Sequence, residues 1–323
     1  MEVAGTWPRL AFMQPPSAIR ALFLCGTLLL ASCEKSHETY GKAFGTSWTL
    51  KASSAAQFQK LLQTDLDRWE GLISHWRPDS AVSRFNESTS TEWQSMPVEI
   101  IELVRLAKRI ADDTDGALDI TLAPLIDLWG FGAKGSRQVP PSDAEIENAR
   151  QHCGWPLLDI RDEPPALRKK HPLLLLNLSA IAEGWALDQL AKRLEAAGAH
   201  EYLLELGGEV LARGHGPDDM PWLVGVQMPV ASTHEPMQAL RLENACLATS
   251  GIYRQHFEHE GKSYPHVLDP RTGRPVAHAL RSVSVKHASA ALADGYATAL
   301  LVLGPKKGRA VAARLKLNVL WME

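Results

Sequence analysis

The clearest hydrophobic periodicity in the chain lies between residues 57 and 73, where apolar side chains recur three and four positions apart, as on one face of a helix. The series is Phe58, Leu61, Leu62, Leu66, Trp69 and Leu72. Further helices are predicted over residues 98–114, 143–153 and 182–197, the second of them capped by Ser142 or Asp143 and the third ended by Gly198. A last helix is predicted over 289–303, stopping at Gly304-Pro305.

Shorter apolar runs predict strands, most of them in the second half of the chain. These are residues 45–50, 173–176, 201–212, 222–227, 246–251, 263–268 and 281–286. A polar stretch over 132–143 predicts a loop, and Asp269-Pro270-Arg271-Thr272-Gly273 has the residues of a tight turn. Because helices and strands mix without a regular βαβ rhythm, we expect an α+β fold with mostly antiparallel sheets flanked by helices. No GxGxxG motif follows a strand, so a Rossmann cofactor site is unsupported.

The N-terminus carries the features of an export signal. Arg9 and Arg20 precede an apolar run over residues 21–31, which is shorter than the roughly 20 residues that span a bilayer. Leu30-Ala31-Ser32-Cys33 resembles a bacterial lipobox. An ordinary signal peptide, or a buried helix that ends in cysteine, would explain the same residues.

The lipobox interpretation divides the chain into three parts. Residues 1–32 would be a signal peptide, residues 33–40 a tether after a lipidated Cys33, and residues 41–323 the functional domain. The acyl chains would hold this domain at a cell membrane, on the periplasmic side of a bacterial inner membrane.

Composition narrows the possible partners. The 323 residues are 45% hydrophobic, which is enough for a sizeable core, and the formal net charge is -3. Charges of both signs are well mixed, so we expect no nucleic-acid partner. Cys153 and Cys246 show no zinc spacing; a disulfide and two buried free thiols are both compatible with them.

The strongest candidate for metal chemistry lies in the last predicted helix. Asp294 and Thr298 are four residues apart and therefore share a helix face. A carboxylate and a hydroxyl are the hard oxygen ligands that magnesium prefers. An aspartate near a helix start is, however, more often a capping or electrostatic residue than a ligand.

Three other stretches have possible chemistry and equally plausible structural explanations. His266, before a tight turn, is a candidate proton acceptor or a plain strand histidine. Gly207-Gly208 inside an apolar strand indicates close approach of a ligand, or a β-bulge. The segment 115–132, with Trp129 and Phe131 between glycines, could form the aromatic floor of a site for a ring-shaped ligand, or it could form a turn in the core.

Together these stretches resemble the ApbE family of FAD:protein FMN transferases. The matching runs occur in family order between about residues 44 and 304: Ser83-Arg84-Phe85-Asn86, 116–132, Asn177-Leu178-Ser179-Ala180-Ile181-Ala182-Glu183-Gly184, 205–209, Ala248-Thr249-Ser250-Gly251, 266–273 and 293–300. The resemblance implies an ApbE-like fold and a magnesium-dependent enzyme. Such an enzyme cleaves FAD, attaches FMN through a phosphoester to a threonine (or serine) of a target flavoprotein, and releases AMP.

The resemblance also assigns roles to individual positions. Asp294, Thr298 and the carbonyl of Ala180 would hold Mg²⁺, with Ala297 adding another carbonyl, and His266 and Asp294 would be the catalytic residues. The flavin nucleotide would contact the cavity residues Phe44, Trp76, Ala117, Leu118, Asp119, Asn177, Glu183, His266 and Leu268. The acceptor would belong to a membrane redox complex.

Two positions depart from the family pattern, which usually has lysine in place of Glu183 and often aspartate in place of Asn177. An anion beside a pyrophosphate should weaken phosphate contact unless metal or Arg271 compensates. Two other activities fit the same residues: an FAD pyrophosphatase that releases FMN and AMP, and a non-catalytic FAD-binding lipoprotein. The presence of candidate acid/base residues argues against the FAD-binding lipoprotein, because storage of FAD requires no proton transfer.

Overall fold

The computed structural model describes residues 37–133, 135–227 and 236–323. Its centre is a seven-stranded sheet with the order β1-β2-β6-β7-β10-β15-β16, in which every neighbouring pair is antiparallel. The strands of this sheet are β1 (His37–Ala43), β2 (Thr46–Ala52), β6 (Tyr202–Leu206), β7 (Glu209–Arg213), β10 (Ala245–Gly251), β15 (Ser282–His287) and β16 (Asn318–Met322).

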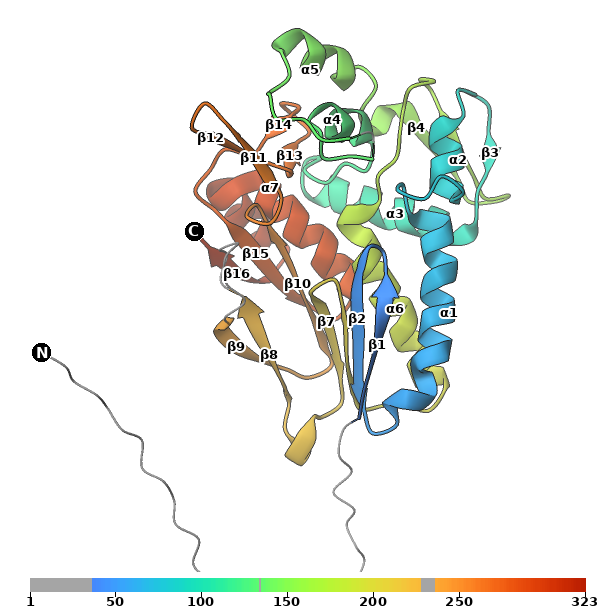
Figure 1. Cartoon of the computed structure of the whole chain (residues 1–323), viewed down its shortest axis with the longest axis vertical. Coiled ribbons are helices and arrows are strands. Elements are labelled where there is room, and N and C mark those ends of the chain that lie inside the picture. Colours follow the sequence, from blue (N-terminus) through green and yellow to red (C-terminus); the bar gives the residue numbers. More distant parts are fainter. Residues whose placement is uncertain (1–36, 134, 228–235) are drawn as a thin grey trace, which may run out of the picture. The chain divides into compact units, whose positions relative to one another are not determined.

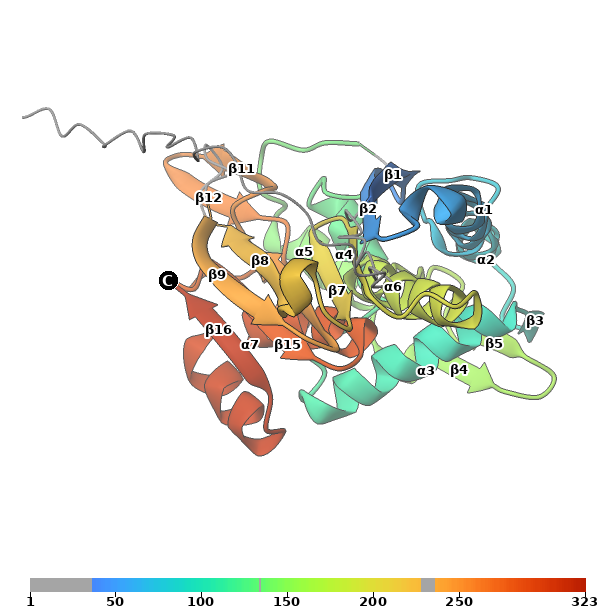
Figure 2. The same ribbon diagram turned by 90° about the horizontal axis from the view of Figure 1, so that it is seen from below.

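Helices cover one face of this sheet and a hairpin covers part of the other (Figures 1 and 2). The main core joins the sheet to α1, α3, α6 and α7, through residues such as Trp48, Leu66, Leu187 and Leu300. The long helices are α1 (Ala55–Ile73), α3 (Val98–Asp113), α6 (Ser179–Ala196) and α7 (Ala290–Arg314). On the opposite face, β8 (Trp222–Gln227) and β9 (Pro236–Leu242) pack Trp222 and Val224 against Ala212 and Leu247.

A third cluster of apolar side chains lies at the upper end in Figure 1 and packs two short helices against two small hairpins. Its buried members include Leu125, Trp129, Ile146, Phe257 and Leu268. The elements are α4 (Ala123–Leu128), α5 (Asp143–Arg150), β11 (His256–His259), β12 (Lys262–Pro265), β13 (Leu268–Asp269) and β14 (Arg274–Pro275). Elsewhere lie α2 (Ala81–Glu87), a sheet of β3 (Gln94–Ser95), β4 (Leu158–Arg161) and β5 (Ala166–Lys169), and two 3-10 turns at Trp155–Leu157 and Pro217–Asp219.

The expected α+β class and the mostly antiparallel sheets are therefore confirmed. The helices predicted over 57–73, 98–114, 143–153 and 182–197 all form, with ends that shift by a few residues. None of the helices in the described part of the chain is both long enough and apolar enough to span a bilayer.

Several sequence predictions about element boundaries were wrong. Residues 173–176 form no strand, only an isolated bridge between Leu122 and Leu175. The single strand predicted over 201–212 is a hairpin, because Gly207 and Gly208 have φ of 66° and 109° and turn the chain. The run 263–268 is divided between β12 and β13.

The start of the domain also differs from the prediction. Strand β1 begins at His37, so the ordered domain starts before residue 41 and residues 37–40 are not a tether. The predicted end of the last helix at Gly304-Pro305 is confirmed, because Gly304 is not helical; a second helical segment follows it to Arg314 within the element α7. The predicted signal peptide and Cys33 lie outside the described residues.

Candidate active site

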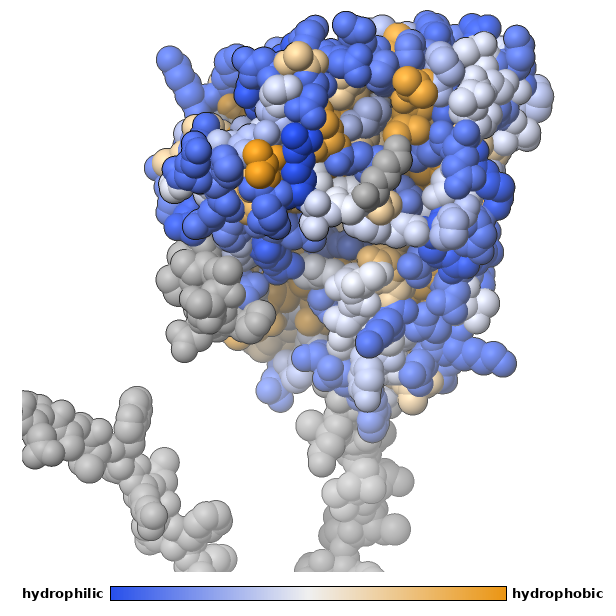
Figure 3. Space-filling model, turned by 45° about the horizontal axis from the view of Figure 1, so that its top comes forward, coloured by the Kyte–Doolittle hydropathy of each residue, from blue (hydrophilic) through white to orange (hydrophobic). Residues whose placement is uncertain are grey.

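A cavity of about 500 Å³ opens where the helix-covered sheet meets the upper cluster of α4 and the small hairpins. This volume is in the usual range for small-molecule and cofactor sites. Figure 3 looks onto this end of the molecule, where hydrophilic residues dominate and a recess lies near the middle of the face. The predicted site residues that line the cavity are Phe44, Trp76, Ala117, Leu118, Asp119, Asn177, Ala180, Glu183, His266, Leu268, Asp294 and Thr298.

Ala297 is the exception among the described candidates. It is fully buried in the main core and does not line the cavity, because it lies on the face of α7 that packs against the neighbouring elements. Its predicted role, a backbone carbonyl for the metal, stays a prediction.

His266 is held in one orientation. Both its backbone N–H and its ring Nδ1 lie 3.0 Å from the carbonyl oxygen of Gln255. Because a carbonyl can only accept, Nδ1 carries the hydrogen, and the neutral ring keeps Nε2 as its free acceptor. Burial lowers the pKa of His266 below its ordinary value of 6.5, which favours this neutral form. The side chain therefore has the protonation state of a general base.

Aromatic side chains support the segment that carries His266. The edge of its ring meets the ring of Phe131 at a centroid distance of 6.3 Å, and Phe131 in turn stacks on Phe257. Trp129 is buried, stacks on Tyr264, and donates from Nε1 to the carbonyl of Gly273 at 2.9 Å. Trp129 thus forms the core turn that was one of the two expectations, while Phe131 lines the cavity.

Asp294 and Thr298 both face the cavity from α7, one turn apart. The Oδ2 atom of Asp294 accepts from the backbone N–H of Gly184 on α6 at 3.1 Å, and Thr298 Oγ1 lies 2.9 Å from Ser250 Oγ on β10. Burial, together with the nearby charge of Glu183, raises the pKa of Asp294 to about 8. A carboxylate in this environment requires a cation or a proton.

Two further carboxyl groups lie beside Asp294. Glu183, on α6, and Glu209, at the start of β7, both line the cavity, and burial raises the pKa of each. The Oε2 atom of Glu209 is buried and has no hydrogen-bond partner in the part of the chain that the structure describes. A Cβ placed on Gly207 would lie 2.2 Å from Oε2 of Glu183, so the glycine makes room for that carboxyl group. Arg254, whose charge acts on Glu183, also lines the cavity.

These oxygens fit a hard cation in chemistry and burial. Within the described residues no group of three or more His, Cys, Asp or Glu side chains is placed to hold a metal. A magnesium site here would therefore need Asp294 and Thr298 together with a carbonyl such as that of Ala180, and water or substrate oxygens. Mg²⁺ usually binds through one or two carboxylates and substrate phosphates, so this set is compatible with it.

His75 is a cavity residue that the sequence did not single out. Its Nε2 lies 3.5 Å from Asn177 Nδ2, and its Nδ1 lies 3.5 Å from Ser179 Oγ. Asn177 Oδ1 accepts from the backbone N–H of Ser179, which turns the amide NH₂ group toward His75. Burial lowers the pKa of His75. The neighbouring Trp76 was the only local signal for it in the sequence.

Phe44 reaches the cavity from the two-residue turn between β1 and β2. Phe44 and Gly45 have φ of 54° and 74°. Positive φ at both central residues is what the favoured two-residue hairpin turn between antiparallel strands requires. A bulky residue is rare in this conformation, and such outliers are found at ligand-binding positions.

Comparison with known proteins agrees with this geometry. Residues 44–321 match the sequence profile of the ApbE family, so the chain belongs to that family. It is 37% identical to an FAD:protein FMN transferase of Vibrio cholerae serotype O1, over 92% of this chain and 91% of the relative. It is 35% identical to the enzyme of the same name from Escherichia coli strain K12, over 94% and 92%.

Solved structures show the same fold. The flavin transferase ApbE from Vibrio cholerae superposes with a TM-score of 0.81 at 34% identity, covering 89% of this chain and 93% of that one. The apo form of the flavinyl transferase ApbE from Pseudomonas stutzeri gives 0.79 at 35% identity, covering 89% and 92%. The protein is accordingly a transferase with the activity of an FAD:protein FMN transferase.

Proposed function

We propose that this transferase uses Mg²⁺ to cleave the pyrophosphate of FAD, attaches FMN to a threonine (or serine) hydroxyl of a target flavoprotein, and releases AMP. One observation carries the proposal: an oriented neutral imidazole and the buried oxygens of Asp294 and Thr298 line the same cavity. The similarity to enzymes named FAD:protein FMN transferase supports the identity of the substrate and of the transferred group.

The proposed reaction breaks the phosphoanhydride bond of FAD and forms a phosphoester bond to the acceptor. The acceptor Oγ attacks the FMN phosphorus and forms the new P–O bond, and the bond to the AMP phosphate breaks with its electron pair leaving on AMP. The hydroxyl proton passes to Nε2 of His266, the ring atom that the bond from Nδ1 to Gln255 leaves free. Such general-base help typically contributes about 10²- to 10⁴-fold to a rate.

The cavity is rich in carboxyl groups, so the substrate phosphates need added positive charge to bind there. Asp119, Glu183, Glu209 and Asp294 line it, with Arg254 as a cationic side chain among the described lining residues. A pyrophosphate would be repelled unless positive charge or protons are added. Mg²⁺ held by Asp294, Thr298 and the carbonyl of Ala180 would supply that charge and stabilise the charge that develops on the leaving phosphate.

We further propose that the enzyme is a lipoprotein, anchored through Cys33 and facing the periplasm. The support is the lipobox-like sequence Leu30-Ala31-Ser32-Cys33. Only residues 34–36 would separate the lipid from β1, which begins at His37. Three residues span about 10 Å when extended, so the domain would lie close to the bilayer and to acceptors in membrane redox complexes. Incorporation of radiolabelled palmitate into the wild-type chain, and its loss in Cys33→Ala, would test this anchor.

The decisive test is an incubation with FAD, Mg²⁺ and a membrane redox subunit that carries an exposed threonine. A fluorescent acceptor band with one AMP per FMN transferred is the expected result. Free FMN and AMP, with no labelled band, would identify an FAD pyrophosphatase. Bound but intact FAD would identify a binding protein, and both of these outcomes contradict the proposal. A matched reaction with the acceptor threonine replaced by valine controls for non-covalent flavin.

A further inference from the structure

Helix α7 breaks at Gly304, between one and two turns beyond Thr298, the nearer of the two side chains proposed to hold the metal. Gly304 has φ of 73° and ψ of 179°, which is not helical, and Pro305 has no N–H to donate. In a continuous helix, the N–H groups of residues 305 and 306 would bond to the carbonyls of Leu301 and Val302. The break leaves these two carbonyls in need of other donors.

Both donors come from the segment that follows His266 in the chain. His278 Nε2 lies 2.8 Å from the carbonyl oxygen of Leu301, and Arg271 Nη2 lies 3.5 Å from that of Val302. Arg271 is itself fixed by two bonds of 2.7 Å to the carboxylate of Asp269. His278 therefore replaces the N–H that Pro305 lacks.

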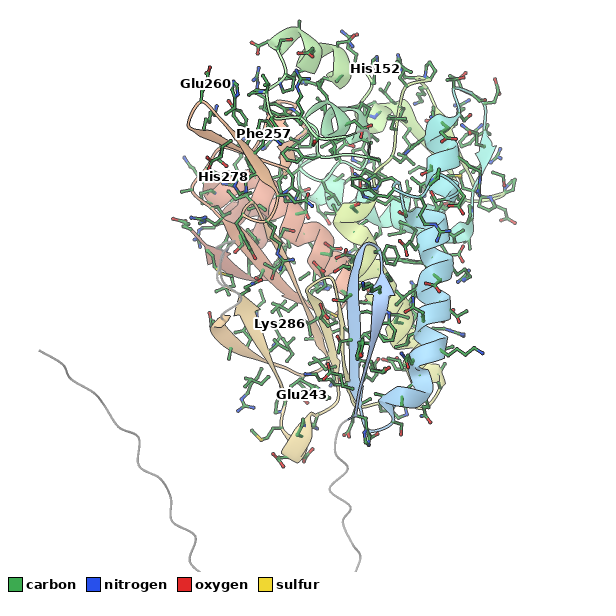
Figure 4. All side chains as sticks on the ribbon, in the orientation of Figure 1. His152, Glu243, Phe257, Glu260, His278 and Lys286 are labelled. Carbon is green, nitrogen blue, oxygen red and sulfur yellow. The ribbon has the colours of Figure 1, made fainter. Side chains whose placement is uncertain are left out.

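The geometry determines which atom of His278 donates. Because a carbonyl can only accept, Nε2 carries a hydrogen. The other ring nitrogen, Nδ1, is buried and has no hydrogen-bond partner among the described residues. The ring also fits against Gly304, where an added Cβ would lie 2.8 Å from His278 Cδ2. Figure 4 shows His278 beside α7, in the region of the hairpin that carries Phe257.

These contacts join the two halves of the active site. The segment begins with His266, the proposed base, and the helix carries Asp294 and Thr298, the proposed metal ligands. Val302, one of the two bonded residues, is itself part of the cavity wall. An apolar side chain of similar size would avoid the unpartnered Nδ1 but would leave the carbonyl of Leu301 without this donor.

We propose that His278 is a positioning residue, which with Arg271 anchors the His266 segment to the break in α7 and so fixes the base opposite the metal-binding face of the helix. This inference rests on the function proposed above. It assigns His278 no contact with FAD, and indeed His278 does not line the cavity. A misplacement of about 1 Å at a reacting centre can reduce a rate by about 10²-fold.

The test compares two substitutions that differ in one donor. His278→Met removes the bond to Leu301, whereas His278→Gln retains an amide N–H near the position of Nε2. We expect His278→Met to lower kcat for FMN transfer at least about tenfold, with the Kd for FAD within about twofold of wild type, and His278→Gln to recover most of kcat. Arg271→Met should give a smaller loss, because its bond is longer.

Controls separate this effect from general damage. Kinetics are measured well below the Tm of each variant, and His200→Met, at an exposed histidine away from the cavity, should behave as wild type. If His278→Met does not fold, Arg271→Met and His278→Gln test the same anchor. Unchanged kcat in His278→Met, or equal losses in the Met and Gln variants, would overturn the positioning role. Absence of transfer by the wild-type protein would instead overturn the proposed function, and the role of His278 with it.

Discussion

The backbone N–H of Gly184 on α6 donates a 3.1 Å hydrogen bond to the Asp294 carboxylate on α7. This bond requires the two helices to be very close. A Cβ on Gly184 would lie 2.4 Å from the carbonyl oxygen of Ala290 and 2.7 Å from Asp294 Cβ. The glycine therefore determines where the proposed metal ligand lies relative to the carbonyl of Ala180, one turn earlier on α6.

Gly184→Ala should consequently damage both packing and metal binding. Overpacking of this kind costs about 1–3 kcal/mol, so the free energy of unfolding in urea should fall by that amount. The displaced Asp294 should also raise the Mg²⁺ concentration needed for half-maximal transfer. Gly71→Ala is the matched control, because Gly71 lies in α1 with nothing within 4 Å of an added Cβ. Gly71→Ala should stabilise the protein by about 0.5–1 kcal/mol. A similar loss of unfolding free energy in both variants would contradict the idea that Gly184 is required for the close approach of α6 and α7.

Asp294→Asn should make the protein more stable at high pH while abolishing its activity. Burial and Glu183 raise the pKa of Asp294 to about 8, so the folded protein retains a proton that the unfolded chain releases near pH 3.8. An acid with a raised folded pKa destabilises the fold progressively as pH rises from its unfolded value to its folded one. The asparagine variant lacks this penalty, and its amide oxygen can still accept from Gly184.

We therefore expect Asp294→Asn to be more stable than wild type at pH 8, by at least about 1 kcal/mol, and equally stable near pH 4. It should carry out no Mg²⁺-dependent transfer. Added Mg²⁺ should raise the Tm of wild type at pH 8 but not that of the variant. A Tm increase of equal size in both proteins would place the metal elsewhere.

The sequence predicted most of the cavity because its residues occur in short motifs, each of which the fold turns toward one point. It could not give the relationships between motifs. Nothing in the order of residues indicates that Gly184 touches α7, or that His278 bonds to Leu301. His75 was missed for the same reason, since its partners Asn177 and Ser179 lie about a hundred positions away.

Two glycine positions show how far local sequence predicts the ends of elements. The apolar run over 201–212 predicted one strand, with a β-bulge or a close ligand approach at Gly207-Gly208; the positive φ angles of these glycines turn it into a hairpin instead. At Gly304-Pro305 the helix end predicted from the sequence is confirmed by the non-helical φ and ψ of Gly304. Side chains from outside the helix bond the carbonyls left free there, and local sequence could not indicate these tertiary partners.

Glu183→Gln should stabilise the protein and strengthen FAD binding. Burial raises the pKa values of both Glu183 and Glu209, and no described residue bonds Glu209 Oε2. A glutamine amide at position 183 could donate to Glu209 and would remove one negative charge from the face of the cavity that receives the pyrophosphate. The effect on stability should grow as pH rises above about 4.5, the ordinary value for glutamate.

The measurements are urea unfolding at pH 5 and pH 8, and FAD titration followed by quenching of flavin fluorescence. Glu260→Gln, at an exposed position in the turn between β11 and β12, controls for the change in net charge. Weaker FAD binding in Glu183→Gln than in this control would show that the Glu183 carboxylate contacts the substrate directly, for example through a sugar hydroxyl. It would contradict the expectation that this carboxylate repels the pyrophosphate.

His266 should produce the acid limb of the pH–rate profile. Its pKa is lowered by burial, so the neutral base persists below pH 6.5 and transfer should decline only as pH falls through a value lower than that. Protonation places a hydrogen on Nε2, the atom that would receive the acceptor proton, because Nδ1 already donates to Gln255. The kcat for FMN transfer, followed from pH 5 to pH 8 with saturating FAD, measures this limb.

His266→Gln should slow transfer by about 10²- to 10⁴-fold and flatten the acid limb, while FAD still binds. The glutamine keeps a polar side chain of similar size, so the aromatic contact with Phe131 is the main packing change. His256→Gln, at the exposed start of β11, is the matched control and should leave both rate and profile unchanged. An acid limb that survives in His266→Gln would assign it to another group, of which His75 in the same cavity is the first to examine.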